Sequence, residues 1–162
     1  MSRPPALLVM ACSRRKDPRL ARGRAWDVYD GRLFQVLKKL LRGQPGWDTS
    51  LTVLIVSARY GVIGTDDEIE PYDDRLTPAV ASRRASEWAQ RLRERLDGRR
   101  FRAAHANLGR PYRDAVPGLA DLIAPAPIDW AGGGIGRRNA QTRRWVASQL
   151  GMASDLISGG AS

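Results

Sequence analysis

Cysteine and histidine are nearly absent from this sequence, which holds one of each among 162 residues. One cysteine excludes an internal disulfide framework, and a single cysteine with a single histidine argues against a zinc site of thiolate and imidazole ligands. We therefore expect no metal and no cofactor. The low cysteine content fits a reducing cytoplasm best.

Long apolar runs are also missing. No stretch approaches the roughly 20 apolar residues that a helix needs to span a bilayer, so we expect no membrane contact. The segment "LLVMAC", which ends at Cys12, superficially resembles the cleavage site of a bacterial lipoprotein. Its apolar part, residues 6–11, is shorter than the apolar region of a signal peptide, and only Arg3 charges the segment before it. We therefore expect no lipid anchor.

Acidic residues are few compared with basic ones. Lys and Arg total 27 against 17 Asp and Glu, which leaves a net charge of +10 and an isoelectric point near 10.9. Such a chain attracts polyanions, nucleotides and anionic surfaces by long-range electrostatics. The alternative is that the arginines reflect coding bias and lie on a solvated surface. The length suits a single domain over residues 1–150, followed by a flexible tail over residues 151–162.

The apolar residues that are present alternate between strand and helix patterns. Residues 6–12, "ALLVMAC", and 51–57, "LTVLIVS", are continuous apolar runs, typical of strands buried on both faces. Between them, apolar residues recur at helical spacing from Trp26, which predicts an amphipathic helix that ends at "GQPG". A strand, a helix and a strand in this order predict two parallel strands joined by a right-handed crossover.

The second half continues the alternation. Thr77 as N-cap and Pro78 in the first turn predict a helix that runs to Leu96. After it we expect a weaker third strand in "RFRAAHANLG" and then one short helix, or two interrupted at Pro117. The stretch "APIDWAGGGIGRRNAQTRRWVASQLG" predicts a short last strand or extended segment, a glycine-rich turn and a final helix. The predicted fold class is α/β: a single three-layer, Rossmann-like domain with a mostly parallel sheet of about four strands.

Four polar segments follow the predicted strands. They read "CSRRK", "SARYG…EPYDD", "ANLGRPYR" and "GGGIGRRN". Ligands of open α/β sheets gather outside the carboxyl ends of the strands, so we expect all four segments to open on the same edge.

The first and last of these segments suggest an anion site. Ser13 and Lys16 suit an anionic group, whereas Cys12 is either a nucleophile in positive potential or a small buried residue at a strand end. In "GGGIGRRN", the N–H groups at a helix start can hold a phosphate, assisted by Arg137 or Arg138. The alternative is a flexible turn in which Asn139 caps the helix.

The third segment offers a stacking side chain. In "NLGRPYR", Tyr112 can stack on a base while Arg113 pairs with a phosphate; the alternative is that Tyr112 packs in the interior and Arg113 is solvated. His105 lies inside the third predicted strand and is expected to be a hydrogen-bonded core residue rather than a general base.

The second segment gathers six of the 17 acidic residues into positions 66–74. We divide them into an exposed turn, "GTDDE", and a constrained unit, "IEPYDD", in which Pro71 restricts the backbone. A carboxylate beside cations suits cleavage of an N-glycosidic bond, which has an oxocarbenium-like transition state. Asp73 is the first candidate for nucleophile or general base and Glu70 is the second. The alternative is structural: the acids neutralise a basic rim and hold the loop.

Taken together, "CSRRK", "VYDGRLF", "VSARYGVI", "EIEPYDDRL", "NLGRPYR" and "GGGIGRR" resemble a family of unknown function related to the YaaA peroxide-stress proteins, over roughly residues 8–147. A similar Cys-Ser-x-x-Lys and Tyr-Asp arrangement occurs in archaeal enzymes that modify deazaguanine in transfer RNA. The resemblance implies work on nucleic acid or nucleobases. The chain departs from the pattern at Val62 and Ile63, where a leucine pair is common. It is also shorter than YaaA and lacks an evident helix-hairpin-helix element, which argues against duplex binding.

The sequence therefore leads to one function and two alternatives. The first is an enzyme that acts at the N-glycosidic bond or base of a nucleotide, nucleoside or nucleic acid. The alternatives are a non-catalytic DNA-binding protein and a small regulatory nucleotide-binding module. The oligomeric state stays open. The candidate binding residues, some from the resemblance, are Cys12, Ser13, Lys16, Tyr29, Ser57, Arg59, Tyr60, Gly61, Tyr72, Gly109, Tyr112, Arg113, Gly134, Gly136 and Arg137.

Overall fold

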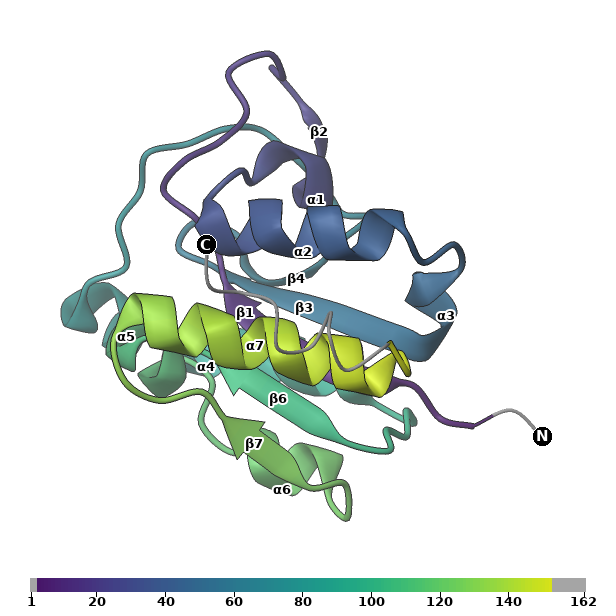
Figure 1. The fold of residues 1–162 in the computed structure, drawn as a ribbon. Helices are drawn as coiled ribbons and strands as arrows, with labels where there is room; N and C mark the ends of the chain where they lie inside the picture. The colour runs from purple at the N-terminus through teal and green to yellow at the C-terminus, as the bar shows by residue number, and fades with distance from the viewer. Residues whose placement is uncertain (1–2, 153–162) are drawn as a thin grey trace.

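The computed structural model describes residues 3–152 and shows a mixed α/β fold around a five-stranded sheet (Figure 1). The strand order is β4-β3-β1-β6-β7, and every pairing is parallel except that of β3 with β4. The strands are β1 (Ala6–Ala11), β3 (Leu51–Ser57), β4 (Gly61–Gly64), β6 (Ala104–Asn107) and β7 (Ile128–Trp130). A separate two-stranded antiparallel sheet joins β2 (Gly23–Arg24) to β5 (Glu68–Ile69).

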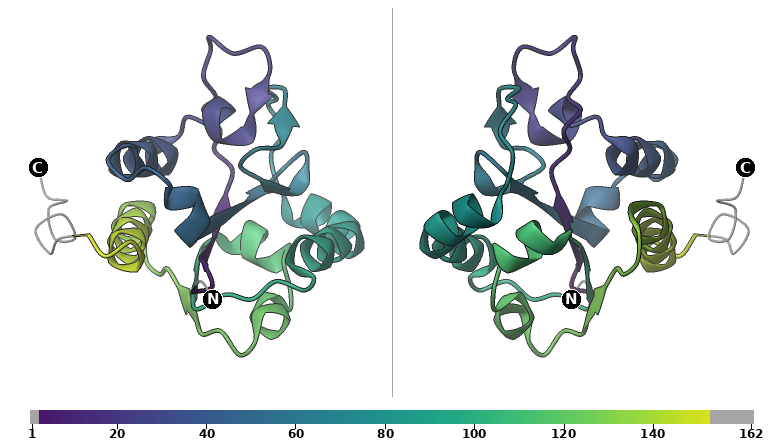
Figure 2. Two further views of the ribbon diagram at one scale, coloured as in Figure 1. Left: turned by 90° about the vertical axis from the view of Figure 1, so that its right-hand side faces the viewer. Right: turned by 90° about the vertical axis from the view of Figure 1, so that its left-hand side faces the viewer.

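Helices cover both faces of the main sheet. The helices are α1 (Ala25–Val28), α2 (Arg32–Arg42), α3 (Trp47–Ser50), α4 (Pro78–Leu96), α5 (Arg110–Asp114), α6 (Leu119–Ile123) and α7 (Ile135–Gln149). Helices α2 and α7 lie side by side on one face, and α4 lies on the other (Figures 1 and 2).

Strand β1 is the centre of the core. Its residues 6–10 are fully buried, because β3 and β6 flank it and helices cover both of its faces. The continuous apolar pattern therefore predicted β1 and β3 correctly.

The helix predicted from Trp26 to residue 42 is interrupted, which corrects the sequence interpretation. Helix α1 ends at Val28, and Tyr29 adopts an extended conformation with φ −71° and ψ 129°. Tyr29 forms a β-bridge with Lys16 and is fully buried, and α2 starts anew after the N-cap Gly31. Tertiary pairing at Tyr29 thus overrides the helical periodicity.

The sheet has one strand more than the about four predicted. The additional strand, β4, lies within the segment "SARYGVIG", where we expected a loop after β3. Gly61 has φ +78°, a conformation that other residues rarely adopt, and it lets the chain turn back beside β3 within a few residues. Gly61 also lies against the indole ring of Trp88, which leaves no space for a side chain at this position.

The other helix predictions hold at their boundaries. The Thr77 side chain accepts a hydrogen bond from the Val80 N–H at 3.2 Å, and α4 runs from Pro78 to Leu96. Two short helices, α5 and α6, stand on either side of Pro117. Asn139 lies inside α7 and does not cap it, because Gly134 is the N-cap.

None of the helices in residues 3–152 has the length and apolar character that a bilayer crossing requires. The tail predicted over residues 151–162 lies, from residue 153 on, outside the described residues.

Candidate functional site

The carboxyl ends of β1, β3, β6 and β7 point to the same edge of the sheet, because the four strands are parallel. Two cavities open at this edge. They share Cys12, Ser13 and Arg14, the residues that directly follow β1. These three residues therefore form a common wall between two adjoining spaces.

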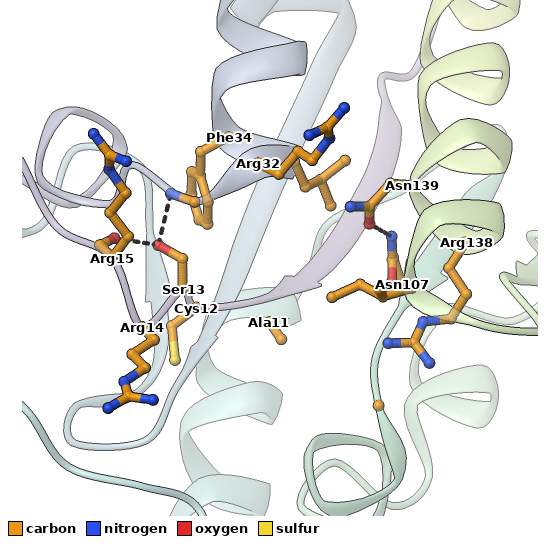
Figure 3. Close-up of a pocket in the computed structure, with 14 residues that line it drawn as sticks. Ala11, Cys12, Ser13, Arg14, Arg15, Arg32, Phe34, Asn107, Arg138 and Asn139 are labelled. Carbon is orange, nitrogen blue, oxygen red and sulfur yellow. Dashed lines mark hydrogen bonds between the residues drawn. The ribbon is translucent and has the colours of Figure 1, made fainter. Parts of the chain in front are cut away.

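The first space, which we call the arginine cavity, has a volume of about 320 Å³ (Figure 3). Four arginines line it: Arg14 and Arg15 after β1, Arg32 at the start of α2, and Arg138 on α7. No Asp or Glu lines it. The other lining residues are Ala11, Cys12, Ser13, Gly31, Leu33, Phe34, Asn107, Gly109, Ile135 and Asn139.

The second space, which we call the aspartate cavity, has a volume of about 300 Å³. Its charged lining residues are Arg14, Lys16, Asp73, Asp74 and Arg75, and Cys12, Ser13, Leu76 and Tyr112 complete it. It thus combines two carboxylates with three cations in one small volume.

Lys16 is held in place at the aspartate cavity. Its ammonium donates to the Arg14 carbonyl at 3.0 Å and lies 4.1 Å from the centre of the Tyr72 ring. Burial lowers the pKa of Lys16, and the nearby Cys12 and Asp73 partly oppose this effect. A lysine in this state releases its proton more readily than one in water.

Tyr112 and Cys12 form the wall on the α5 side. The Cys12 Sγ and the Tyr112 hydroxyl lie 3.4 Å apart. Burial raises the pKa of Tyr112, so its hydroxyl stays protonated at neutral pH and can donate a hydrogen bond.

Behind Lys16, three buried hydroxyls form a closed ring. The Tyr29 hydroxyl donates to Ser57 Oγ at 3.0 Å, and Tyr72 lies 2.7 Å from Tyr29 and 2.8 Å from Ser57. Each hydroxyl has one proton, so Ser57 must donate to Tyr72 and Tyr72 to Tyr29. The ring joins β3 to the segment that carries Asp73 and so positions that segment.

Tyr60 holds the other end of the same segment. Its hydroxyl accepts from the Glu70 N–H at 3.2 Å and donates to the Glu70 carbonyl at 3.3 Å. The contact uses only the Glu70 backbone, and Glu70 does not line the aspartate cavity.

A chain of hydrogen bonds leads from the surface to the arginine cavity. His105 is fully buried; its Nδ1 lies 2.8 Å from Asp129 Oδ2 and its Nε2 lies 2.9 Å from Thr142 Oγ1. Asn107 Nδ2 donates to Thr142 Oγ1 at 2.9 Å and to Asn139 Oδ1 at 3.2 Å. The prediction that His105 is a hydrogen-bonded core histidine is therefore correct.

The sequence candidates divide into three groups. Those that line one of the two cavities are Cys12, Ser13, Lys16, Asp73, Gly109 and Tyr112. Those that are buried, and support the walls instead of lining them, are Tyr29, Ser57, Gly61 and Tyr72. Those that line neither cavity and are partly or fully exposed are Arg59, Tyr60, Glu70, Arg113, Gly134, Gly136 and Arg137.

Two members of the last group have other partners. The Arg113 guanidinium lies 4.1 Å from the centre of the Trp130 ring, and Arg137 lines a separate groove beside Trp145. The sequence offered Arg137 or Arg138 as the arginine that assists phosphate binding, and of the two only Arg138 lines the arginine cavity.

Sequence reasoning missed Arg32 and Asn107. Arg32 follows the N-cap Gly31 at the start of α2, in a region where the sequence predicted a continuous helix, so no helix start indicated a site there. Asn107 ends β6 directly before "LGRPY", and a polar residue at the end of a buried strand was the available signal. No group of three or more His, Cys, Asp or Glu side chains within residues 3–152 could hold a metal ion.

The chain belongs to DUF6884, a family of unknown function whose model matches residues 7–144. The matched region contains the main sheet except Ala6, and all lining residues of the two cavities. No curated protein and no solved structure matches the chain.

Proposed function

We propose that this protein is an enzyme that cleaves the N-glycosidic bond of a nucleoside or nucleotide in the aspartate cavity. The observation that carries the proposal is that Asp73, Lys16 and Tyr112 line one cavity at the carboxyl edge of the sheet. A carboxylate that can accept a proton therefore stands in the same small space as two groups that can donate one.

The three-layer, Rossmann-like arrangement expected from the sequence is part of this proposal. The position of α2 and α7 on one face of the sheet and of α4 on the other agrees with it. In such folds the edge at which the two cavities open is the usual place for a ligand.

The proposed reaction is hydrolysis. The bond between the anomeric carbon and the base nitrogen breaks, and its electron pair stays with the base. Water forms the new carbon–oxygen bond and gives one proton to Asp73, while Lys16 or Tyr112 protonates the leaving base. Asp73 also stabilises the positive charge that develops on the sugar. The net reaction consumes one water and yields a free base and a sugar.

Removal of the Asp73 carboxylate tests the assignment. Wild-type protein is incubated with a panel of nucleosides and nucleotides, and the released base is measured by liquid chromatography. We expect Asp73→Asn to slow the release by at least about 100-fold, the range of a lost general base. Glu70→Gln is the matched control, because this carboxylate lies three residues earlier and outside the cavity. Release by Asp73→Asn at the wild-type rate would overturn the role of Asp73, and no release from any panel member would overturn the reaction.

A non-catalytic DNA-binding protein is the second candidate, and the net charge of +10 favours it. Binding to a polyanion releases counterions, so its affinity for DNA would fall steeply between 50 and 200 mM salt. DNA affinity that changes little with salt excludes this candidate. Nucleotide binding without turnover would instead favour a regulatory module.

A further inference from the structure

We propose that the arginine cavity binds a phosphate group, so that the ligand of this protein is a nucleoside phosphate and not a free nucleoside. The nucleoside part of this inference rests on the proposed function. The phosphate part rests on the arginine cavity alone.

The charge of the cavity is the first argument. Four arginines line about 320 Å³, and no Asp or Glu lines it. Within residues 3–152, only Arg15 among them has an acidic partner, Asp30, at 3.4 Å. Positive charges around one space repel one another, and a bound anion would offset this repulsion. Arginine is the side chain best suited to bind phosphate.

Two helix starts add to this charge. Helices α2, with 11 residues, and α7, with 15, both begin at the cavity, and neither N-cap, Gly31 or Gly134, makes a side-chain capping bond. The cavity is lined by residues of both first turns, among them Leu33 and Ile135. The N–H groups of a first turn have no partner within the helix, and the helix dipole is positive there. Figure 1 shows that α2 and α7 run side by side in the same direction, so their positive ends meet.

Arg138 is poised for a ligand. Its Nε is buried without a hydrogen-bond partner, and its Nη1 makes only a long contact of 3.4 Å with the Gly133 carbonyl. Its Nη2 lies 3.8 Å from the point that a Cβ on Gly109 would occupy, an ordinary contact distance, so the guanidinium lies beside Gly109. A buried donor without a partner is costly, and a phosphate oxygen would relieve this cost.

Asn139 supplies a further donor. Its Oδ1 accepts from Asn107, which turns its Nδ2 away from that contact, and Figure 3 shows this nitrogen on the side of Arg32. The orientation is set by the buried chain of Asn107, Thr142 and His105, so the donor is positioned before any ligand arrives.

The two cavities adjoin, because they share the wall of Cys12, Ser13 and Arg14, and together they can form one site. Cys12, Ser13 and Arg14 line both spaces, so a ligand that crosses this wall can place a phosphate on one side and its glycosidic bond on the other. A nucleoside monophosphate has the two groups at opposite ends of one sugar. The substrate class that the two cavities fit together is therefore a phosphate monoester of a nucleoside.

Binding measurements on the whole chain test the inference. The ligands are nucleoside monophosphates, the matching nucleosides and inorganic phosphate, measured by calorimetry at low salt. We expect the monophosphate to bind at least about 10-fold more tightly than its nucleoside, since a hydrogen bond to a charged group contributes about 1.5–3 kcal/mol, where 1.4 kcal/mol is tenfold. Inorganic phosphate should compete with the monophosphate.

A matched pair of variants locates the site. Arg138→Gln should lose most of the preference for the monophosphate, whereas Arg137→Gln, one residue earlier on α7 and outside the cavity, should keep it. Arg32→Gln is a second variant at an exposed position, so we expect the fold to persist and the preference for the monophosphate to fall. Equal affinities for nucleoside and monophosphate, or equal losses in Arg138→Gln and Arg137→Gln, would overturn the inference.

The outcomes also separate this inference from the proposed function. Phosphate-dependent binding that requires Arg138, without release of base from any substrate, supports the phosphate site and refutes the hydrolysis. Hydrolysis of free nucleosides as fast as of monophosphates, unaffected by Arg138→Gln, supports the hydrolysis and refutes the phosphate site.

Discussion

The side-chain hydroxyls of Tyr29 and Tyr72 lie 2.7 Å apart in the interior, although 43 residues separate them in the sequence. Ser57 closes the ring, and its Oγ also accepts from the Tyr60 N–H at 3.0 Å. The Tyr72 ring in turn carries the Lys16 ammonium on its face. The wall of the aspartate cavity thus rests on the buried ring of three hydroxyls. Such a buried polar network stabilises one defined structure only if every hydroxyl has its hydrogen-bond partner.

Loss of one hydroxyl should therefore weaken the fold. Tyr72→Phe keeps the ring below Lys16 but leaves the buried hydroxyls of Tyr29 and Ser57 short of a partner. We expect a loss of about 1–3 kcal/mol in the free energy of unfolding, measured with urea. Tyr60→Phe is the control, because the Tyr60 hydroxyl is closer to solvent and binds only the backbone of Glu70. An equal or larger loss in Tyr60→Phe would contradict the importance of the ring.

The turn between β3 and β4 should not tolerate a side chain at Gly61. A Cβ there would lie 2.8 Å from both Cδ1 and Nε1 of Trp88, and φ is +78°. We expect Gly61→Ala to cost about 2–4 kcal/mol of unfolding free energy, from backbone strain together with the clash. Gly98→Ala separates the two causes, because Gly98 has φ +67° but open space around its Cβ position. A cost in Gly98→Ala as large as that in Gly61→Ala would show that the contact with Trp88 is unimportant.

The stability of the fold should depend on pH through His105. Burial lowers the pKa of His105 below its ordinary value of 6.5, and the hydrogen bond and charge of Asp129 oppose this effect in part. The unfolded chain takes up a proton near pH 6.5 while the folded state does not, so the unfolding free energy falls as the pH drops below 6.5. The slope should be at most about 1.4 kcal/mol per pH unit.

Because His105 is the only histidine, this slope can be measured without interference from another imidazole. Asp129→Asn removes a group that raises the pKa of His105, so the decline should extend to lower pH. Urea unfolding at a series of pH values between 5 and 7.5 tests both statements. A free energy of unfolding that stays constant over this interval would refute them.

The six acidic residues of positions 66–74 should not contribute equally to the stability of the fold. The Asp67 carboxylate pairs with Arg95 of α4 and accepts from the Gly64 N–H at 3.3 Å, and its side chain is 30% exposed. Asp66 pairs with Arg24 and is 81% exposed. We expect Asp67→Asn to lower the free energy of unfolding by about 1 kcal/mol, and Asp66→Asn to change it by less than about 0.5 kcal/mol. Thermal unfolding of the two variants and the wild type measures the difference. The opposite order would contradict the assignment of Asp67 as the anchor of this turn.

These residues also show where sequence reasoning succeeded. Within the segment "GTDDE", residues 65–67 form the expected turn, while Gly64 ends β4 and Glu68 begins β5. The structural alternative holds for Asp67, whose ion pair with Arg95 ties the turn to α4. Asp73 alone of the two catalytic candidates lines a cavity. The sequence could not separate Glu70 from Asp73, because both carboxylates flank the same Pro-Tyr pair and only the folded backbone decides which of them lines the cavity.

The tyrosines show where sequence reasoning failed. Tyr29 and Tyr72 were candidate binding residues together with Tyr112, yet Tyr29 is fully buried and Tyr72 is nearly so. A phenol that closes a buried ring of hydroxyls has the same local sequence signal as one that faces a ligand. The interruption of the first helix at Tyr29 has the same origin, since the partner that pulls it out of the helix is remote in sequence.

By itself, the sequence determined the main alternation of strands and helices, though not β4 or the break between α1 and α2. It also determined the parallel pairing of β1 with β3 and the edge at which polar segments gather. Apolar periodicity and helix caps are local properties, and the parallel order of strands follows from the crossover rule. Only the tertiary structure decided that Arg14, Arg15, Arg32 and Arg138 share one cavity, and that Asp73 faces another across the same wall. These cavities bring together segments that lie up to 124 residues apart. Local sequence patterns therefore could not predict which arginines line the same cavity.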